Sequence, residues 1–290
     1  MKRRDNDIFL LWLLPMALVL LCFVILPLLV TVVDSLYSVS LLNVSDRSFA
    51  GADNYLTVLK DANVRTAAGN TLFYTVVSLT AETVLGIAAA VALKEKYRGR
   101  SVILAVLSIP WALPPMVNSM TWKLIFDPSV GILNEILLQW GVIDAYQVWL
   151  NNPELSKWCV TTVHVWKMLP FIVIIMLARL QTMPREIMEA AETDGASAVQ
   201  KFRYFTFPYL RPVLFITLAQ GTIGAVHLFD EPYAMTGTAL DTRTLLIQDY
   251  LTAFREYNLG TGMALALLIS VSILLLMVLY AKLAGRQEEW

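Results

Sequence analysis

The sequence predicts an all-α membrane protein with six transmembrane helices. The chain is 57% hydrophobic and only 16% charged, whereas soluble domains are about half apolar and a quarter charged. The apolar residues gather in six long runs, each of about 20 residues or more, enough to cross ~30 Å of hydrocarbon. A soluble protein with buried helices is the alternative, but six such runs leave too little polar sequence to coat a core.

The six predicted spans follow one another along the chain, near residues 8–33, 70–93, 102–124, 158–180, 209–229 and 263–284. Lys2, Arg3 and Arg4 precede the first run, as in a secretory signal. That run is longer than a signal's apolar region, so we expect an uncleaved first helix. Cys22 and Cys159 lie in or beside apolar runs and are expected to behave as small hydrophobes.

Lysine and arginine indicate the orientation of the spans. Twelve lie at the N-terminus, in the loops at 94–101 and 181–208 and in the C-terminal tail, whereas five lie in the alternate stretches at 34–69, 127–156 and 230–262. Positive charge stays on the cytoplasmic side. We therefore expect both termini and the 181–208 loop in the cytoplasm, and the loops at 34–69, 125–157 and 230–262 outside.

The outer loops carry turn and helix signals. Gly51 is a predicted turn before an amphipathic stretch, and Asp127-Pro128 and Gly131 are turn signals before an apolar stripe typical of an interfacial helix. Neither a low-complexity linker nor an internal repeat is evident. A single membrane domain over 1–290 is predicted.

The loop at 182–208 is charged and alanine-rich between two apolar spans. Thr182 and Pro184 suit a helix start, and Gly195 suits the residue after a helix C-terminus, where φ is positive. A second helix is expected to end before Pro208. This helix, glycine turn and helix could be a docking surface or an ordinary amphipathic loop, and the residues alone leave both open.

The spacing within this loop resembles a known motif. Glu189-Ala190-Ala191, Gly195 and Phe205-Thr206-Phe207-Pro208 resemble the EAA loop, EAA-x3-G-x9-I-x-L-P, of permeases in binding-protein-dependent ABC importers, with phenylalanine at the isoleucine and leucine positions. Other stretches, among them "IPWALPPMVNSMTWKLIFDPSVGILN" and "VWKMLPFIVIIMLARLQTMP", are similar to the carbohydrate-type, maltose-like branch. Where that branch often has Thr-Gly-Gly-Pro, this chain has Thr236-Gly237-Thr238-Ala239. This departure concerns the shape of the last outer loop and not the family.

The resemblance implies a type I ABC importer permease fold in a bacterial inner membrane. It also implies a second homologous permease, two cytoplasmic ATPase subunits that bind ATP and Mg, and an extracytoplasmic solute-binding protein. The loop would be a coupling helix seated in a groove of the ATPase, and its carried-over coupling residues are Glu189, Ala190, Ala191, Asp194 and Gly195.

The chain's own motifs indicate no catalysis. It contains neither a G-x-x-x-x-G-K-[ST] phosphate loop nor a G-x-S-x-G nucleophile elbow. The only histidines are His164 and His227, and the sequence has no His/Cys cluster suited to a metal. We therefore expect a non-enzymatic subunit with no cofactor or metal of its own and no nucleic-acid partner.

Polar residues inside spans usually face the bundle interior or a cavity; here they are Glu82, Asn118, His164, Lys167, Gln220 and His227. The resemblance places sugar contacts on the third, fourth and fifth spans, at Trp111, Pro115, His164, Lys167, Met168, Phe171, Gly221, Ala225 and Leu228. Trp111 and Phe171 could stack on a sugar ring. For Glu82, His164 and His227, an interhelical bond or packing role is the alternative.

Lys167 leaves two interpretations open. With His164 at i−3 and Phe171 at i+4 on the same helix face, it could bind a sugar bearing an acidic group. It could instead pair with an acidic side chain, such as Glu82 or one on the partner permease. Beyond a sugar importer, the sequence also allows an importer of another solute, such as a glycerophosphodiester, or a membrane scaffold or enzyme without transport.

Overall fold

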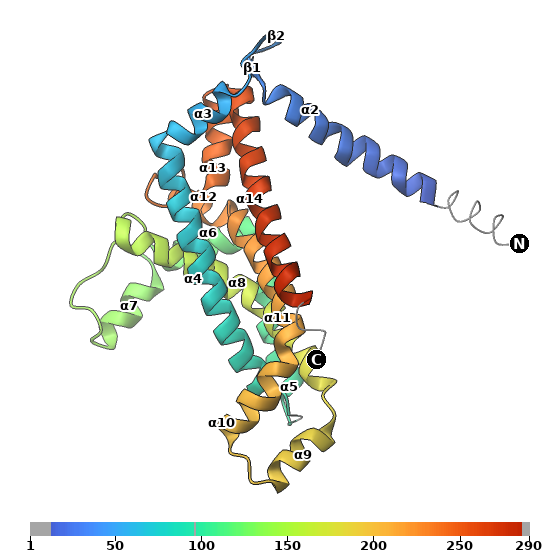
Figure 1. Ribbon diagram of the computed structural model, residues 1–290. Coiled ribbons are helices and arrows are strands. Elements are labelled where there is room, and N and C mark those ends of the chain that lie inside the picture. Colours follow the sequence, from blue (N-terminus) through green and yellow to red (C-terminus); the bar gives the residue numbers. More distant parts are fainter. Residues whose placement is uncertain (1–12, 96, 286–290) are drawn as a thin grey trace, which may run out of the picture. The chain divides into compact units, whose positions relative to one another are not determined.

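Residues 13–95 and 97–285 are described by a computed structural model (Figure 1). Lys2, Arg3, Arg4, Lys96, Arg286 and the first residues of the first predicted span lie outside these residues. Chain contacts divide the molecule into two units, Met1–Val64 with Gln248–Val271, and Arg65–Ile247 with Ser272–Trp290. Each unit is described separately below.

Within the described residues, five helices are long and apolar enough to cross a membrane, and a sixth span results if one sharply bent pair counts as one. The five are Leu13–Asp34, Ala62–Ala92, Pro153–Gln181, Ala198–Thr236 and Leu259–Ala284. The helical, multi-span architecture predicted from the apolar runs is confirmed.

The first unit contains the N-terminal helix, with its π-helical turn η1 (Leu21–Ile25) and α2 (Leu26–Asp34), and a hairpin that an all-α prediction omits. Strands β1 (Tyr37–Ser40) and β2 (Asn43–Phe49) pair antiparallel, with Tyr37 opposite Phe49. Helix α3 (Asp53–Lys60) follows the turn at Gly51. Later in the chain come η3 (Leu251–Arg255) and the first part of α14 (Leu259–Gly285).

Asn54 fastens the parts of this first unit together. Its buried amide donates to the Ser35 and Tyr37 carbonyl oxygens at 2.8 and 2.9 Å, and its oxygen accepts from the Thr261 hydroxyl at 3.2 Å. The bonds from Asn54 give partners to the backbone carbonyls of Ser35 and Tyr37, which directly follow the first span. A buried backbone acceptor needs such a partner.

The second unit is organised around α8 (Pro153–Gln181), which packs against α5 (Arg100–Ala112), α6 (Pro115–Ile125), α11 (Phe207–Val226) and α12 (Asp230–Thr236). Asn152 caps α8 by accepting from the Glu154 and Leu155 amides, and Pro153 occupies its first turn. The largest apolar cluster joins α8 to α11 and to α4 (Ala62–Ala92), through residues such as Ala90, Ile172, Met176 and Leu210.

The third predicted span is not a straight helix. Helices α5 and α6 meet at a bend of 100°, so the prediction of one helix over 102–124 was wrong. Leu113 and Pro114 are extended, with ψ of 138° and 135°, and Pro115 begins α6. Two consecutive prolines explain this, because each disfavours helical geometry in the residue before it.

The segment before Pro208 also differs from the prediction. Helix α10 (Ala198–Lys201) runs through a π-helical turn, η2 (Phe202–Thr206), directly into α11. The Phe207 amide donates to the Phe202 carbonyl, and the wider turn accommodates a proline that has no N–H of its own. The second helix of the loop therefore does not end before Pro208.

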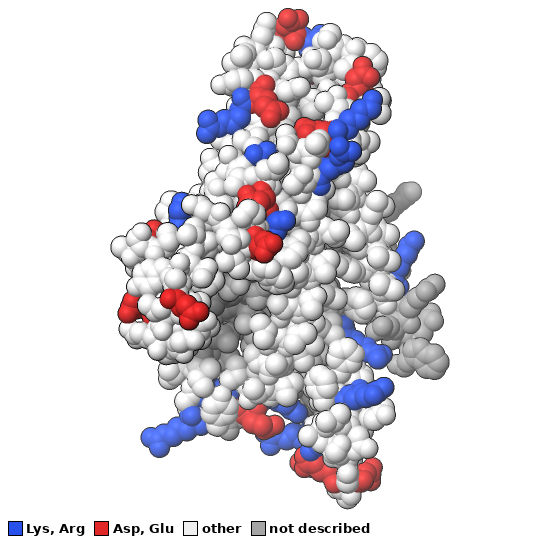
Figure 2. Space-filling model, turned by 90° about the vertical axis from the view of Figure 1, so that its left-hand side faces the viewer, with Lys and Arg blue, Asp and Glu red and all other residues white. Residues whose placement is uncertain are grey.

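The second unit also contains α7 (Ile132–Gln139), α9 (Arg185–Thr193) and the start of α13 (Leu245–Tyr250), whose residues from Gln248 on belong to the first unit. The turn before α7 forms as predicted, because Asp127 Oδ1 accepts from the Ser129 and Val130 amides. Figure 2 shows blue and red side chains at the end where α9 and α10 lie in Figure 1, below a mostly uncharged surface.

Candidate functional site

The loop between the fourth and fifth spans forms a helix–turn–helix. Helix α9 ends in a Schellman motif: the Ala196 amide donates to the Ala191 carbonyl at 2.9 Å and the Gly195 amide to the Glu192 carbonyl at 3.0 Å. Gly195 has a φ of +74°, as predicted for the residue after the helix C-terminus. An added Cβ there would meet no atom within 4 Å, so backbone conformation alone requires glycine.

One further contact stabilises the start of α10, and another links α10 to α9. Ser197 and Gln200 form a reciprocal capping box at the start of α10. Lys201 Nζ donates to Glu192 Oε1 at 2.9 Å, and this hydrogen bond holds the pKa of the Glu192 carboxyl below its usual value. The turn is thus held by backbone, side-chain and charged contacts at once.

The carried-over coupling residues do not all lie on the surface. Glu189, Ala190, Asp194 and Gly195 are exposed, whereas Ala191 is buried, with 4% of its surface accessible. Of the two neighbouring alanines, only Ala190 is therefore available at the surface, because Ala191 is buried.

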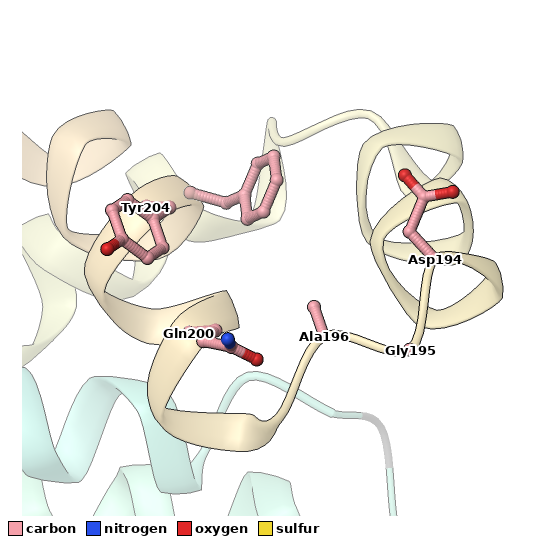
Figure 3. A pocket seen from close by; sticks show the side chains of 6 residues that line it. Asp194, Gly195, Ala196, Gln200 and Tyr204 are labelled. Carbon is pink, nitrogen blue, oxygen red and sulfur yellow. The ribbon is translucent and has the colours of Figure 1, made fainter.

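A cavity of about 280 Å³ adjoins this turn, lined by Asp194, Gly195, Ala196, Gln200, Tyr204 and Phe205. In Figure 3, Gln200 and Tyr204 project from the α10 side of the cavity, and the Asp194–Ala196 turn borders it opposite. The helix–turn–helix therefore presents both a convex helix, α9, and a hollow beside it.

The second candidate site is a cluster of buried charged side chains within the spans. His164 on α8 lies between two carboxylates: its Nε2 is 3.7 Å from Glu82 Oε1 on α4, and its Nδ1 is 3.5 Å from Glu231 Oε1 on α12. All three side chains are at most 4% exposed. His164 therefore links three helices, as its interhelical interpretation predicts, and Glu82 has the interhelical role expected of it.

Lys167 joins the same cluster one turn further along α8. Its Nζ lies 3.7 Å from Glu231 Oε1, and its side chain is 15% exposed. The lysine pairs with an acidic side chain of its own chain, although with Glu231 rather than the Glu82 suggested by the sequence. His227, by contrast, is exposed and places its Nδ1 3.0 Å from the carbonyl of Ile223 on its own helix.

Helix α11 approaches the cluster closely through two glycines. A Cβ added at Gly221 would lie 2.7 Å from Leu79 Cδ2 and 3.1 Å from Glu82 Oε2. A Cβ added at Gly224 would lie 3.9 Å from both His164 Cε1 and Met168 Cε. The structure therefore brings together the predicted His164, Lys167, Met168 and Gly221.

The other predicted substrate residues occupy different environments. Trp111 and Phe171 stack on each other, with ring centroids 6.0 Å apart and planes 26° apart, so each ring covers one face of the other. Ala225 and Leu228 are buried, and Leu228 packs in the cluster of Tyr74, Val160 and Met235. Pro115 lies directly after the bend between α5 and α6.

Glu231 was missed by sequence reasoning. The fifth span was predicted to end at residue 229, which assigned the acidic pair Asp230-Glu231 to an outer loop. The sequence signal was present, because these acids directly follow the apolar run and precede Pro232, which suits the first turn of a new helix. Among the described residues, no group of three or more His, Cys, Asp or Glu side chains is placed to hold a metal ion.

Comparison with known protein families identifies the family of this chain. Residues 82–289 match the family described as the inner membrane component of binding-protein-dependent transport systems. The chain belongs to this family. This match confirms the family predicted from the loop at 182–208. Membership of the family accounts for the helical, multi-span fold.

Two relatives of this transport component match it over nearly their whole length. It is 36% identical to the trehalose/maltose transport system permease protein MalF of Thermococcus litoralis, over 97% of this chain and 95% of the relative. It is 28% identical to the sulfoquinovosyl glycerol transport system permease protein SmoG of Agrobacterium fabrum, over 98% and 92%.

A solved structure shares the fold. The crystal structure of a bacterial alginate ABC transporter, in complex with an alginate pentasaccharide-bound periplasmic protein, contains a chain that matches with a TM-score of 0.85. Sequence identity is 19%, and the match covers 99% of this chain and 97% of the other. The transport component therefore has the fold of an ABC importer subunit.

Proposed function

We propose that this chain is a permease subunit that moves a sugar or sugar derivative inward across a bacterial inner membrane. The observation that carries the proposal is the near full-length similarity to a permease named for trehalose and maltose. A second relative is named for sulfoquinovosyl glycerol. Both relatives are thus named for the transport of sugars or sugar glycosides.

The proposed partners follow from the family. They are a second homologous permease, two cytoplasmic ATPase subunits and an extracytoplasmic solute-binding protein, with ATP and Mg held by the ATPase. Neither cofactor is assigned to this chain, and the chain itself is proposed to be non-catalytic. The proposed domain is a single transmembrane domain over 1–290 with both termini in the cytoplasm.

Helix α9 is the proposed contact with the ATPase. Its end is held by the Schellman motif at Gly195 and by the Glu192–Lys201 bond, and its exposed surface includes Glu189 and Ala190. A contact that transmits force must resist deformation, and these bonds supply that resistance. Glu189, Ala190, Asp194 and Gly195 are the proposed contact residues, with Ala191 in a supporting position.

The proposed substrate face lies on the third, fourth and fifth spans. The cluster around His164 and Lys167 is the part of it with polar chemistry, and the Trp111–Phe171 stack is the part with aromatic surface. Pro115, Met168, Gly221, Ala225 and Leu228 are proposed on the same path. Ala225 and Leu228 are buried, so they would reach substrate only after the helices move.

The proposal is tested by reconstituting the complete importer in lipid vesicles and measuring ATP-dependent uptake of radiolabelled trehalose and maltose. Uptake that needs this chain, the ATPase and the binding protein supports the function. Uptake of a glycerophosphodiester without any sugar would favour the alternative solute, and failure of the purified chain to bind an ATPase would favour a scaffold or enzyme.

The proposed contact is tested separately by charge reversal. Glu189→Lys is expected to lower binding of the ATPase subunit to the purified permease about tenfold, a typical effect of losing one central contact. Asp144→Lys is the matched control, because Asp144 is also an exposed acid but lies outside α9. Equal binding by both variants would remove Glu189 from the contact.

A further inference from the structure

The buried charges of the second unit are unevenly shared around Lys167. Glu231 Oε1 lies 3.7 Å from Lys167 Nζ and 3.5 Å from His164 Nδ1, so one carboxylate oxygen serves both bases. Glu82 approaches His164 from the opposite side. The Lys167 side chain thus lies in a cluster that contains two carboxyl groups, those of Glu82 and Glu231, and a single lysine.

We infer that the cargo of this permease is an uncharged, hydroxyl-rich sugar, and that Glu231 determines this by occupying Lys167. The inference rests on the proposed function and narrows its substrate class. It also decides between the two interpretations of Lys167, in favour of a pair within the chain.

The position of Glu231 opposes an anionic cargo in two ways. A sulfonate or carboxylate on the sugar would have to displace Glu231 from Lys167, and Glu231 is 96% shielded from water, so its charge is poorly screened. The same anion would then face the displaced carboxylate of Glu231, and repulsion between like charges is stronger in a site of low dielectric constant. A neutral sugar meets neither obstacle.

The unsatisfied atoms of the cluster suit hydroxyl groups. Both carboxylate oxygens of Glu82 and both ring nitrogens of His164 are buried, and none of these atoms has a hydrogen-bond partner among the residues that the structure describes. Buried polar atoms normally have partners, and a sugar hydroxyl can both donate to a carboxylate and accept from a nitrogen. Met168 and Phe171 lie on α8, the helix of His164, and the Trp111–Phe171 stack adds apolar surface there, which suits the carbon face of a sugar ring.

The pairing is tested first without any cargo. Lys167→Met, Glu231→Gln and the double variant are each purified in the complete importer, and thermal unfolding is followed. Each single change removes one partner of a largely buried ion pair and is expected to lower the midpoint by about 5 °C or more, whereas the double variant recovers most of this loss. Additive losses in the double variant would overturn the pair.

The cargo class is tested by uptake in vesicles, with radiolabelled trehalose and its 6-carboxylate analogue as probes. Wild type is expected to import trehalose at least about tenfold faster than the acid, the single variants to lose about tenfold in trehalose uptake, and the double variant to recover to within about threefold. Fast import of the acid that is selectively lost in Lys167→Met would overturn the inference, as would a double variant as defective as the singles.

The two measurements separate this inference from the proposed function. If the wild-type importer takes up neither sugar, the proposed function fails and the cargo class fails with it, whatever the unfolding data show. If it takes up trehalose but unfolding shows no compensation between Lys167 and Glu231, the function stands and the inference fails.

Discussion

Gly221 lies so close to Glu82 that a Cβ added to the glycine would be 3.1 Å from Glu82 Oε2. The same Cβ would be 2.7 Å from Leu79 Cδ2. This close approach lets α11 pack directly over the buried carboxylate of α4, and it leads to the first prediction.

Gly221→Ala is expected to destabilise the protein by about 1–3 kcal/mol, because overpacking a tight helix contact forces neighbouring side chains to move. Gly224→Ala, three residues along the same helix, is the control, since its Cβ would have ordinary contacts at 3.9 Å. Thermal unfolding of the purified protein measures both. Equal stability of the two variants would contradict the close packing at Gly221.

A second prediction concerns the end of α9. Gly195→Ala is expected to cost about 1–2 kcal/mol, because a φ of +74° is unfavourable for a residue with a Cβ. The cost should appear as faster backbone hydrogen exchange at the C-terminal end of α9.

Gly69→Ala is the matched control for this change. Gly69 also has open space around its Cβ position, but it lies within α4 at an ordinary helical φ. There alanine should stabilise the helix by about 0.5–1 kcal/mol. Destabilisation of similar size at both positions would show that the positive φ of Gly195 is not the cause.

The Glu192–Lys201 bond predicts a pH dependence in the loop. The pKa of the Glu192 carboxyl is lower in the folded protein than in the unfolded chain. The stabilisation that this carboxylate provides is therefore present above the unfolded pKa of about 4.3. The contribution is lost as the pH falls through the lower folded value. Hydrogen exchange at Gly195 and Ala196, corrected for intrinsic rates, should therefore accelerate in acid.

Lys201→Met should remove that acid-dependent step, because the methionine cannot donate to Glu192. A variant with the same acid response as wild type would assign the response to another group. Lys94, which also lowers the pKa of Glu192, is then the group to replace.

The predicted orientation of the chain in the membrane can be tested with single cysteines. In a background without Cys22 and Cys159, Ser45→Cys in β2 should react with an impermeant maleimide on intact cells, and Glu186→Cys in α9 should not. Both positions are exposed. Labelling of residue 186 from outside would reverse the topology inferred from the lysine and arginine counts.

The sequence predicted well whatever depends on local chemistry. Five of the six apolar runs fall in long helices, because a backbone in lipid must satisfy its hydrogen bonds internally. Gly195 became the residue after the end of α9, because a positive φ favours glycine and the flanking residues favour helix.

The errors arose where prolines act through their surroundings. Pro114 and Pro115 break the third span, whereas Pro208 is carried within a continuous helix because a π-helical turn precedes it. Whether such a turn forms depends on the packing of neighbouring helices, which the order of residues does not specify.

The partners of buried charges were also beyond sequence reasoning. Lys167 and His164 were recognised as unusual, but their partner Glu231 lies 64 residues after Lys167 by numbering and on another helix. Similarly, Ala190 and Ala191 are equivalent in composition, yet only Ala191 is buried. Both facts depend on how helices pack, and helical periodicity alone does not fix that.

The π-helical turn at Phe202–Thr206 has a mechanical consequence. Because it joins α10 to α11 without a break, the chain from Ala198 to Val226 is one lever about 40 Å long at 1.5 Å per residue. A continuous helix can carry a displacement along its length. We expect that a displacement of the helix–turn–helix at one end would move Gly221 relative to Glu82 near the other end.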